Sequence, residues 1–327
     1  MCFYVHKICP VTANDRNDAG NEAQVKQRIS HILLFVFYIL LRVLPVITQD
    51  RLADSVGRLF YKLDKKHQKI MYDNLKRAFK EEYSDEKLNE IALQSIQDLV
   101  KTAFEFIRFP LYKEEDLIRM VEIEGAENMV NARREGKGVV AVSSHFGNWE
   151  LLAWRIVQLG HPLTAVGREQ EDGFINNLIV QMRTSKGTGH IPRGVPMFQH
   201  INELLAKNEV VGLVSDQNAG TRGVFVDFFD TTVSAFKGPA LFAVRTGCKV
   251  VPVFIVREGY EKHRAFFMPA IEIQKSGDVG KDIRNYCQAY TKVIEDFVRE
   301  YPTQWFWIHK RWKTRPPGES TEEMNPS

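Results

Sequence analysis

The residues with the clearest capacity for chemistry are His145 and Glu150, which lie five positions apart. An imidazole becomes an effective general base when a carboxylate orients one of its nitrogens and stabilises the imidazolium that forms. On a continuous helix, residues five apart are separated by roughly 140° and do not face each other. If His145 lies in a loop and Gly147 permits a sharp bend, Glu150 can fold back toward the ring. The alternative is a hydrogen-bonded loop histidine beside an ordinary first-turn acid, which the helix dipole favours.

The segments on either side of His145 predict the elements that position it. Val139–Val142 is a largely β-branched apolar run, which is typical of a strand covered on both faces. From Asn148 onward the apolar residues recur at helical spacing. His145 is therefore expected at the carboxyl end of a strand, where open α/β sheets bind their ligands.

The sequence Ser-His-Phe-Gly-Asn-Trp-Glu-Leu over residues 144–151 resembles the His-x4-Asp/Glu motif of membrane acyltransferases. It looks most like the lauroyl/myristoyl acyltransferases of lipid A biosynthesis, in the lysophospholipid acyltransferase superfamily. The resemblance covers residues 32–318 and implies an αβα layered, glycerol-3-phosphate-acyltransferase-like fold. It implies a His145/Glu150 dyad as general base, acyl carrier protein as acyl donor, a lipid A precursor as acceptor, and no metal or cofactor. It also implies the inner (cytoplasmic) membrane as location, with the catalytic domain on the cytoplasmic face.

Length and charge limit the number of domains and the classes of binding partner. The chain has 327 residues, enough for one large domain or two small ones. Its 44 Lys and Arg nearly balance 41 Asp and Glu, so a net charge of +3 gives no bulk attraction for nucleic acid. The cysteines show no metal-type pairing and predict free thiols in a reducing compartment. They are Cys2, Cys9, Cys248 and Cys287.

The apolar run Ile32–Ile47 is the candidate membrane anchor. Ten uncharged residues precede Arg42, and Pro45 follows. Because a span needs about 20 mostly apolar residues, a short tilted span, an interfacial helix and a core helix all remain open, and we expect membrane attachment. The expected segments are a flexible extension (1–30), a membrane-anchor helix (31–48), an acyltransferase domain (49–318) and a disordered tail (319–327).

Strands and helices are expected to alternate after residue 120. The predicted strands lie near Val121–Ile123, Val139–Ser143, Leu163–Val166, Val210–Ser215, Val250–Val256 and Ala265–Ile273. The predicted helices lie near Ala126–Glu135, Asn148–Leu159, Asp172–Ser185, Pro196–Lys207, Lys237–Thr246 and Val279–Glu300. This alternation predicts an αβα layered fold around a largely parallel sheet.

Three arginines are candidates for binding an anionic acceptor. Arg168 follows the third predicted strand, where a guanidinium can pair bidentately with phosphate or form a rim salt bridge. Arg183 lies at the end of the next helix, where a cation is favoured in any case, and Arg193 lies in a tight turn. The resemblance implies that one such arginine stabilises the acceptor or the developing charge.

Three further residues are candidate substrate contacts. Asp216 and Gln217 follow the strand after these arginines and resemble the family's Asp-Gln/His motif, although a turn residue bonding its own backbone is the plain alternative. Lys237 opens a helix whose N-terminus favours anions. Between them, Asp230 replaces a glycine of the family pattern. The nearby phenylalanines, as a wall of an acyl channel or as simple core, are Phe225, Phe228, Phe229 and Phe236.

The segment 301–317 combines tryptophans with cations. Trp305, Trp307 and Trp312 beside Lys310 and Arg311 predict a surface at the level of lipid headgroups. It resembles the family's closing Trp-x-His-[Lys/Arg]-Arg-[Phe/Trp]-Lys sequence. A basic RNA-binding tail is the alternative, but no nucleic-acid module surrounds it.

The predicted reaction is transfer of an acyl group from a thioester to a lipid hydroxyl. Rival acceptors are a lysophospholipid, glycerol phosphate or another glycolipid. A metal-dependent hydrolase is disfavoured because His145 and Glu150 lack a second histidine at helical spacing. A lipid-binding scaffold without activity is the non-enzymatic rival.

Overall fold

A computed structural model describes residues 31–32, 35–167, 172–191, 195–259 and 261–318. Contacts divide the chain into two compact units, Met1–Leu44 and Pro45–Ser327. The predicted extension (1–30) and tail (319–327) lie outside the described residues.

The apolar run of the candidate anchor does not form one long helix. Residues 35–43 are helical, the helical geometry stops at Leu44, and α2 (Val46–Leu63) begins after Pro45. Proline lacks the N–H that a continuing helix needs and clashes with the preceding turn, so it divides the run. Within the described ranges, no helix combines the length and the apolar character that crossing a membrane requires. The prediction of a single anchoring helix over 31–48 is therefore not supported.

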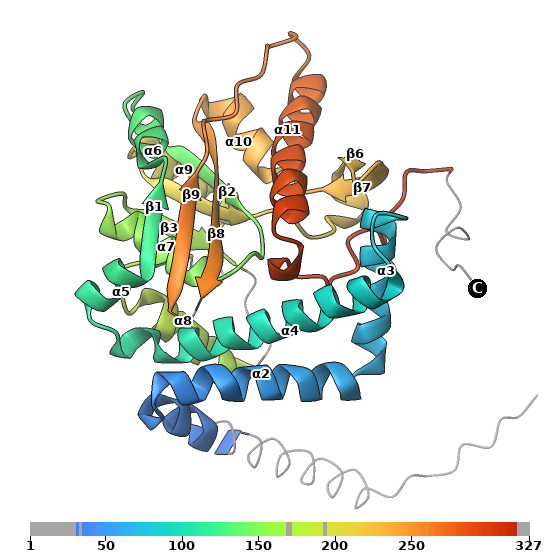
Figure 1. Cartoon of the computed structure of the whole chain (residues 1–327). Coiled ribbons are helices and arrows are strands. Elements are labelled where there is room, and N and C mark those ends of the chain that lie inside the picture. The colour runs from blue at the N-terminus through green and yellow to red at the C-terminus, as the bar shows by residue number, and fades with distance from the viewer. Residues whose placement is uncertain (1–30, 33–34, 168–171, 192–194, 260, 319–327) are drawn as a thin grey trace, which may run out of the picture. The chain divides into compact units, whose positions relative to one another are not determined.

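A seven-stranded sheet forms the centre of the second unit (Figure 1). Its order across the sheet is β1 (Val121–Glu124), β9 (Lys262–Phe267), β8 (Lys249–Gly259), β2 (Val139–Ser143), β5 (Val210–Val214), β3 (Leu163–Val166) and β4 (Gly189–His190). Neighbouring strands are parallel except for β8 and β9, which pair antiparallel. The predicted strand over 265–273 ends early, at Phe267, two residues before Pro269, which has no N–H to donate to a ladder. The predicted parallel-rich α/β sheet is confirmed.

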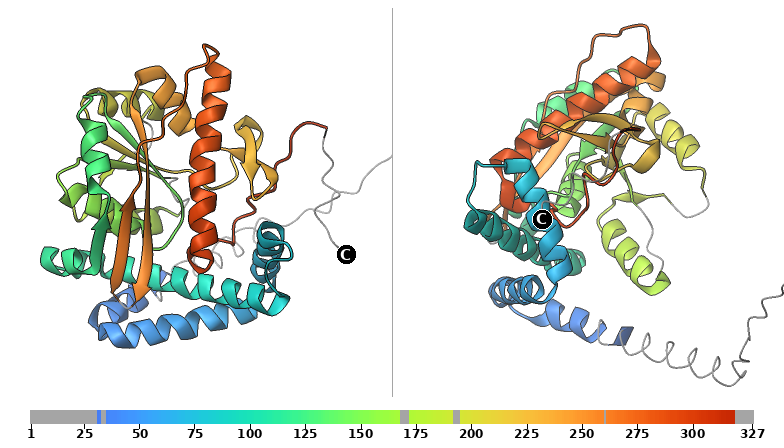
Figure 2. Two further views of the ribbon diagram at one scale, coloured as in Figure 1. Left: turned by 45° about the horizontal axis from the view of Figure 1, so that its top comes forward. Right: turned by 90° about the vertical axis from the view of Figure 1, so that its right-hand side faces the viewer.

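Helices cover both faces of this sheet (Figure 2). Successive side chains of a strand point to opposite faces, and β2 accordingly sends Val140 and Val142 into one buried cluster and Val139 and Ala141 into another. One face carries α9 (Met197–Ala206), α10 (Gly238–Thr246) and α11 (Val279–Glu300). The other carries α5 (Glu114–Met120), α6 (Ala126–Arg133) and α7 (Trp149–Gln158). The remaining helix of the alternating part is α8 (Gly173–Thr184).

Two of the helices that precede the sheet contribute contacts to the site from outside the alternating part. They are α3 (Lys65–Phe79) and α4 (Asp85–Arg108). The Ser84 hydroxyl accepts from Lys87 N at 3.3 Å, which satisfies one free N–H of the first turn of α4. α4 ends at Arg108, two residues before Pro110, which cannot continue an α-helix. Its inner face brings Thr102 and Glu105 against the loop that follows β2.

A hairpin of β6 (Val224–Phe228) and β7 (Thr231–Ala235) was not predicted. Its two turn residues, Phe229 and Asp230, both have positive φ (51° and 52°), as a type I′ turn requires. Asp230, where the family pattern has glycine, tolerates this conformation and pairs with Lys80 Nζ at 3.2 Å.

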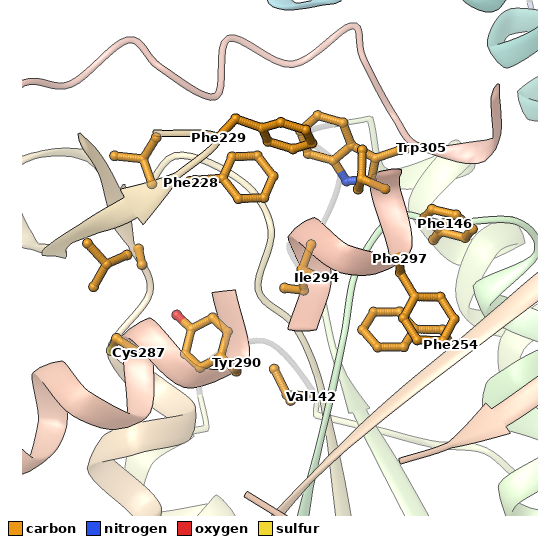
Figure 3. Packing of buried hydrophobic residues seen from close by; sticks show 14 of the residues in the cluster. Val142, Phe146, Phe228, Phe229, Phe254, Cys287, Tyr290, Ile294, Phe297 and Trp305 are labelled. Carbon is orange, nitrogen blue, oxygen red and sulfur yellow. The ribbon is translucent and has the colours of Figure 1, made fainter. Parts of the chain in front are cut away.

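The hairpin places Phe228 and Phe229 in the aromatic core, contrary to the channel-wall hypothesis. Figure 3 shows both rings next to Trp305. The Phe228 ring lies 5.6 Å from the Trp305 ring, and Phe229 lies 5.5 Å from Phe79. Such edge-to-face and tilted contacts are the usual geometry of packed aromatic side chains. These two residues therefore stabilise the fold and do not line an open channel.

Candidate active site

His145 lies in the short loop between β2 and α7, at the carboxyl end of a central strand. The loop bends at Gly147, whose φ is +52° and where a Cβ would lie 2.2 Å from Ile255 O. Only glycine fits this approach. α7 begins at Trp149, directly after this bend, because Asn148 caps the helix: its Oδ1 accepts from Leu151 N at 3.1 Å. The sequence Gly-Asn therefore turns the chain sharply and leaves His145 at the carboxyl end of β2.

The carboxylate that holds His145 belongs to Asp216, which follows the adjacent strand β5. His145 Nδ1 and Asp216 Oδ1 are 2.8 Å apart, and Oδ2 accepts from the His145 backbone N–H at 2.9 Å. Trp305 Nε1 donates to the same Oδ2 at 2.9 Å. The imidazole is 25% exposed, and its Nε2 makes no hydrogen bond to the residues that the structure describes. This arrangement puts the ring's lone pair on Nε2, available to a substrate.

The electrostatics of the pair favour a protonated imidazole. Burial of His145 opposes its charged form, but the charge and the hydrogen bond of Asp216 outweigh burial, and Glu150 adds a smaller effect, so the pKa of His145 is raised above its usual value. Burial likewise opposes the ionised form of Asp216, but His145 and the hydrogen bonds from the loop and Trp305 lower its pKa. The His145–Asp216 pair therefore stabilises the imidazolium that forms when a general base takes up a proton.

Glu150 does not orient His145, which corrects the predicted geometry of the dyad. Its carboxylate accepts two hydrogen bonds from Arg183, one of them from Nε to Oε2 at 3.0 Å. Two features account for this: Nδ1 of His145 is already taken by Asp216, and a buried carboxylate on α7 needs a charged donor. Gly167 lets Arg183 approach the end of β3, since a Cβ there would lie 3.1 Å from Nη1. Glu150 acts on His145 only through its charge.

We expect the Glu150–Arg183 pair to behave as one structural unit. Arg183→Ala should lower the free energy of unfolding by about 3 kcal/mol, because it leaves a buried carboxylate without its partner. The double variant Glu150→Gln/Arg183→Ala should recover part of that loss, since no unpaired charge remains. Denaturant unfolding of Arg183→Ala, of Glu150→Gln and of the double variant measures this coupling. A loss in the double variant equal to the sum of the two single losses would show that the ion pair has no coupling energy.

The other predicted substrate contacts that the structure describes make no hydrogen bond or ion pair with His145. Arg168 and Arg193 lie outside the described residues. Gln217 contributes its backbone carbonyl, which accepts from Arg311 at 2.9 Å. Lys237 is exposed at the N-terminal end of α10 and makes no ion pair with a described residue.

Segment 304–306, whose role the sequence motifs do not indicate, packs against the loop of His145. Gln304 O accepts from Gly147 N, and His145 O accepts from Phe306 N, both at 3.1 Å. The Phe306 ring also lies 5.6 Å from the imidazole. Trp305, Trp307 and Trp312 are at most 2% exposed, so the predicted headgroup-level surface is wrong for the tryptophans. They are core residues, and Trp305 reaches the site through its indole N–H.

A second missed group lies beneath the loop, on α4. Glu105 Oε2 accepts from Asn148 Nδ2 at 2.7 Å, and Thr102 Oγ1 donates to Gly147 O at 3.2 Å. Although burial favours the neutral acid, Arg257 and His263 hold the pKa of Glu105 below its usual range. The sequence signal was two polar residues three apart on an otherwise apolar helix face, which places both on one side of the helix.

The site is an imidazole oriented by a carboxylate, and its Nε2 makes no hydrogen bond to a described residue. Nothing in the described ranges groups three or more His, Cys, Asp or Glu side chains as a metal site would. The arrangement can remove a proton from a hydroxyl and hold the resulting positive charge.

Known proteins give this geometry a context. The profile of a family described as "Bacterial lipid A biosynthesis acyltransferase" matches residues 21–314. The chain is 27% identical over 274 residues to the lipid A biosynthesis palmitoleoyltransferase of Escherichia coli K12, covering 83% of this chain and 86% of the relative. It is 26% identical over 277 residues to the lipid A biosynthesis lauroyltransferase of the same organism, covering 84% and 88%. It is also 27% identical over 213 residues to the phosphatidylinositol mannoside acyltransferase of Mycobacterium tuberculosis H37Rv, covering 64% and 66%.

Proposed function

This chain belongs to the bacterial lipid A biosynthesis acyltransferase family, and from that premise we propose that it transfers a fatty acyl chain from a thioester to a hydroxyl of a lipid A precursor. The observation that carries the proposal is the His145–Asp216 pair, 2.8 Å apart, with Nε2 free of any described partner. Acyl transfer to a hydroxyl needs such a base, because a neutral hydroxyl is a weak nucleophile.

In the proposed reaction, Nε2 of His145 takes the proton as the hydroxyl oxygen attacks the thioester carbonyl carbon. A C–O bond forms, the carbonyl oxygen takes up negative charge, and the C–S bond then breaks as the C=O bond re-forms. The imidazolium, stabilised by Asp216, returns its proton to the leaving thiolate. The thioester is already activated, so no covalent enzyme intermediate is required. The Glu150–Arg183 pair holds the start of α7, next to the loop that carries the base.

The proposed donor is acyl carrier protein and the proposed acceptor is a phosphorylated glucosamine lipid. Two relatives named for lipid A support this acceptor. A relative named for phosphatidylinositol mannoside favours a second candidate, an acyltransferase for another glycolipid. The shared chemistry is a lipid-borne hydroxyl, and the head group distinguishes the two.

A transfer assay with purified full-length protein tests the proposal. Acyl carrier protein charged with a labelled acyl chain is offered with a lipid A precursor, a lysophospholipid or a mannosylated phosphoinositide. We expect the labelled product from the lipid A precursor, identified by mass spectrometry. Transfer to the mannosylated lipid alone would move the assignment to the second candidate. Failure of every pair, with acyl coenzyme A tried as the alternative thioester, would contradict acyl transfer to these lipids.

We further propose association with the cytoplasmic face of the inner membrane through the surface of α2. Exposed apolar side chains at the end of α2 include Leu59 and Leu63, which are 57% and 70% exposed. Exposed Arg58 and Lys62 flank them. Apolar side chains among cations are what an anionic lipid surface attracts.

Replacing Leu59 and Leu63 together by glutamine should weaken binding to anionic vesicles by about tenfold, because each leucine loses apolar contact with the acyl region. Flotation of the full chain with vesicles of anionic and of neutral phospholipid measures the effect. Val279→Gln, at a residue 59% exposed on α11, is the matched control and should bind as the wild type does. Unchanged flotation of the double variant would remove α2 from the membrane contact.

A further inference from the structure

His309 is a second imidazole beside the His145–Asp216 pair. Its Nε2 accepts from the backbone N–H of Asn218 at 2.9 Å, and Asn218 follows Asp216 by two residues. Its own carbonyl accepts from Asn74 Nδ2 at 2.9 Å. The loop after β5 therefore holds the ring through Nε2, and a buried residue of α3 holds the His309 backbone. The charges of Asp216 and His145 both act on the pKa of His309.

The hydrogen bond to Asn218 decides where the proton of His309 lies. Because Nε2 accepts, a neutral His309 ring carries its hydrogen on Nδ1. That nitrogen makes no hydrogen bond to the described part of the chain. Burial lowers the pKa of His309. The charges of Arg311, His145 and Lys313 lower this pKa further, whereas the charge of Asp216 raises it. At neutral pH the ring is thus an uncharged N–H donor.

The pKa values of the two imidazoles are shifted in opposite directions. The pKa of His145 is raised and that of His309 is lowered. When the surroundings shift the pKa values of two groups in one site apart, the two groups commonly have different roles in acid–base catalysis. A raised pKa next to a carboxylate suits a base, and a neutral N–H suits a donor to developing negative charge, since a neutral imidazole polarises a carbonyl without giving up its proton.

We propose that His309 is a further catalytic residue, which donates a hydrogen bond from Nδ1 to the thioester carbonyl oxygen as that oxygen becomes negative. The inference rests on the proposed function and adds a role to it. No proton is transferred at this nitrogen: the hydroxyl proton goes to His145 and then to the leaving thiolate. The rival role for His309 is structural, namely to hold the Asn218 backbone through Nε2.

Two substitutions separate these roles because each places a polar side-chain group near the position of one ring nitrogen and leaves the other position empty. His309→Gln offers an oxygen near the place of Nε2, so it can still accept from Asn218 N, but it has no group near Nδ1. His309→Asn offers an amide N–H near the place of Nδ1, but it does not reach Asn218. A catalytic donor is restored by asparagine, whereas a structural acceptor is restored by glutamine.

The experiment measures kcat, KM and thermal unfolding of full-length variants, with acyl carrier protein as donor and the lipid acceptor that the wild type uses. For His309→Gln we expect kcat to fall about 100-fold at unchanged KM and Tm, because a donor used only in the transition state is lost. We expect His309→Asn to keep a higher kcat than His309→Gln despite a lower Tm. His200→Gln, at a half-buried histidine of α9, should leave kcat and Tm unchanged.

A near-wild-type kcat for His309→Gln would overturn the inference, and so would a His309→Asn variant that is less active than His309→Gln. Both results would leave the proposed function intact, because the wild type would still transfer the acyl chain. Absence of transfer by the wild type itself would instead contradict the proposed function.

Discussion

His145→Ala is expected to lower kcat about 1,000-fold or more while the protein stays folded. The imidazole is the proposed base, and general-base catalysis contributes about 10²–10⁴-fold. The loop should keep its conformation, because the His145 backbone N–H, which donates to Asp216 at 2.9 Å, is unaffected by the substitution. Transfer from acyl carrier protein to the lipid acceptor, followed under saturating substrate, measures the effect.

A histidine elsewhere in the same unit provides the control for this substitution. His161 is buried just before β3, at the opposite end of the sheet, and its Nδ1 lies 3.0 Å from Arg133 Nη1. His161→Ala should lose stability but retain kcat. If His145→Ala stayed within about tenfold of the wild-type kcat, the base would have to be another group.

Asp216→Asn is expected to lower kcat by about 1,000-fold and to change the pH dependence of the reaction. An amide in place of the carboxylate can donate to Nδ1 and so select the tautomer with its hydrogen on Nε2, which cannot act as a base. It also removes the charge that stabilises the imidazolium. Within the described residues no second carboxylate contacts Nδ1, and Glu150 is bound to Arg183.

The direction of the pH change follows from the pKa of His145. In the wild type Asp216 raises that pKa, so kcat/KM should fall as pH drops through a value above about 6.5, where the base becomes protonated. In Asp216→Asn the raising charge is gone and burial remains, so the acid limb should move to lower pH. A pH profile of both proteins between about pH 5 and 9 tests this. An acid limb at the same pH in both would show that Asp216 does not set the pKa of the base.

The two carboxylates of the site illustrate what spacing along the chain can and cannot predict. The motif places Glu150 five residues after His145, and the Glu150 charge contributes to the raised pKa of the imidazole. It does not reveal which acid makes the hydrogen bond. That contact depends on β2 and β5 being neighbours in the sheet, which brings residues 71 positions apart within 2.8 Å.

Residues 301–317 are a second case in which a local sequence pattern does not predict tertiary contacts. Tryptophans beside cations are typical of a membrane surface, and that interpretation of residues 301–317 is wrong for the tryptophans because α3, α4 and the β6–β7 hairpin cover them. Asn74 and Ser95 hold the carbonyls of Trp307 and Trp305 at 2.7 Å each. These contacts join residues more than 200 positions apart, and no local pattern encodes them.

The sequence by itself determined the alternation of strands and helices, the position of His145 at the end of a buried strand, and the bend at Gly147. Each of these depends on interactions between residues a few positions apart, such as apolar periodicity and the freedom of glycine. The tertiary structure alone decided that Asp216 orients the base, that Glu150 pairs with Arg183, and that His309 lies beside them. Strand order and the return of the chain's last segment control these contacts, because a hydrogen bond requires two groups within about 3 Å and the sequence does not specify which distant groups meet.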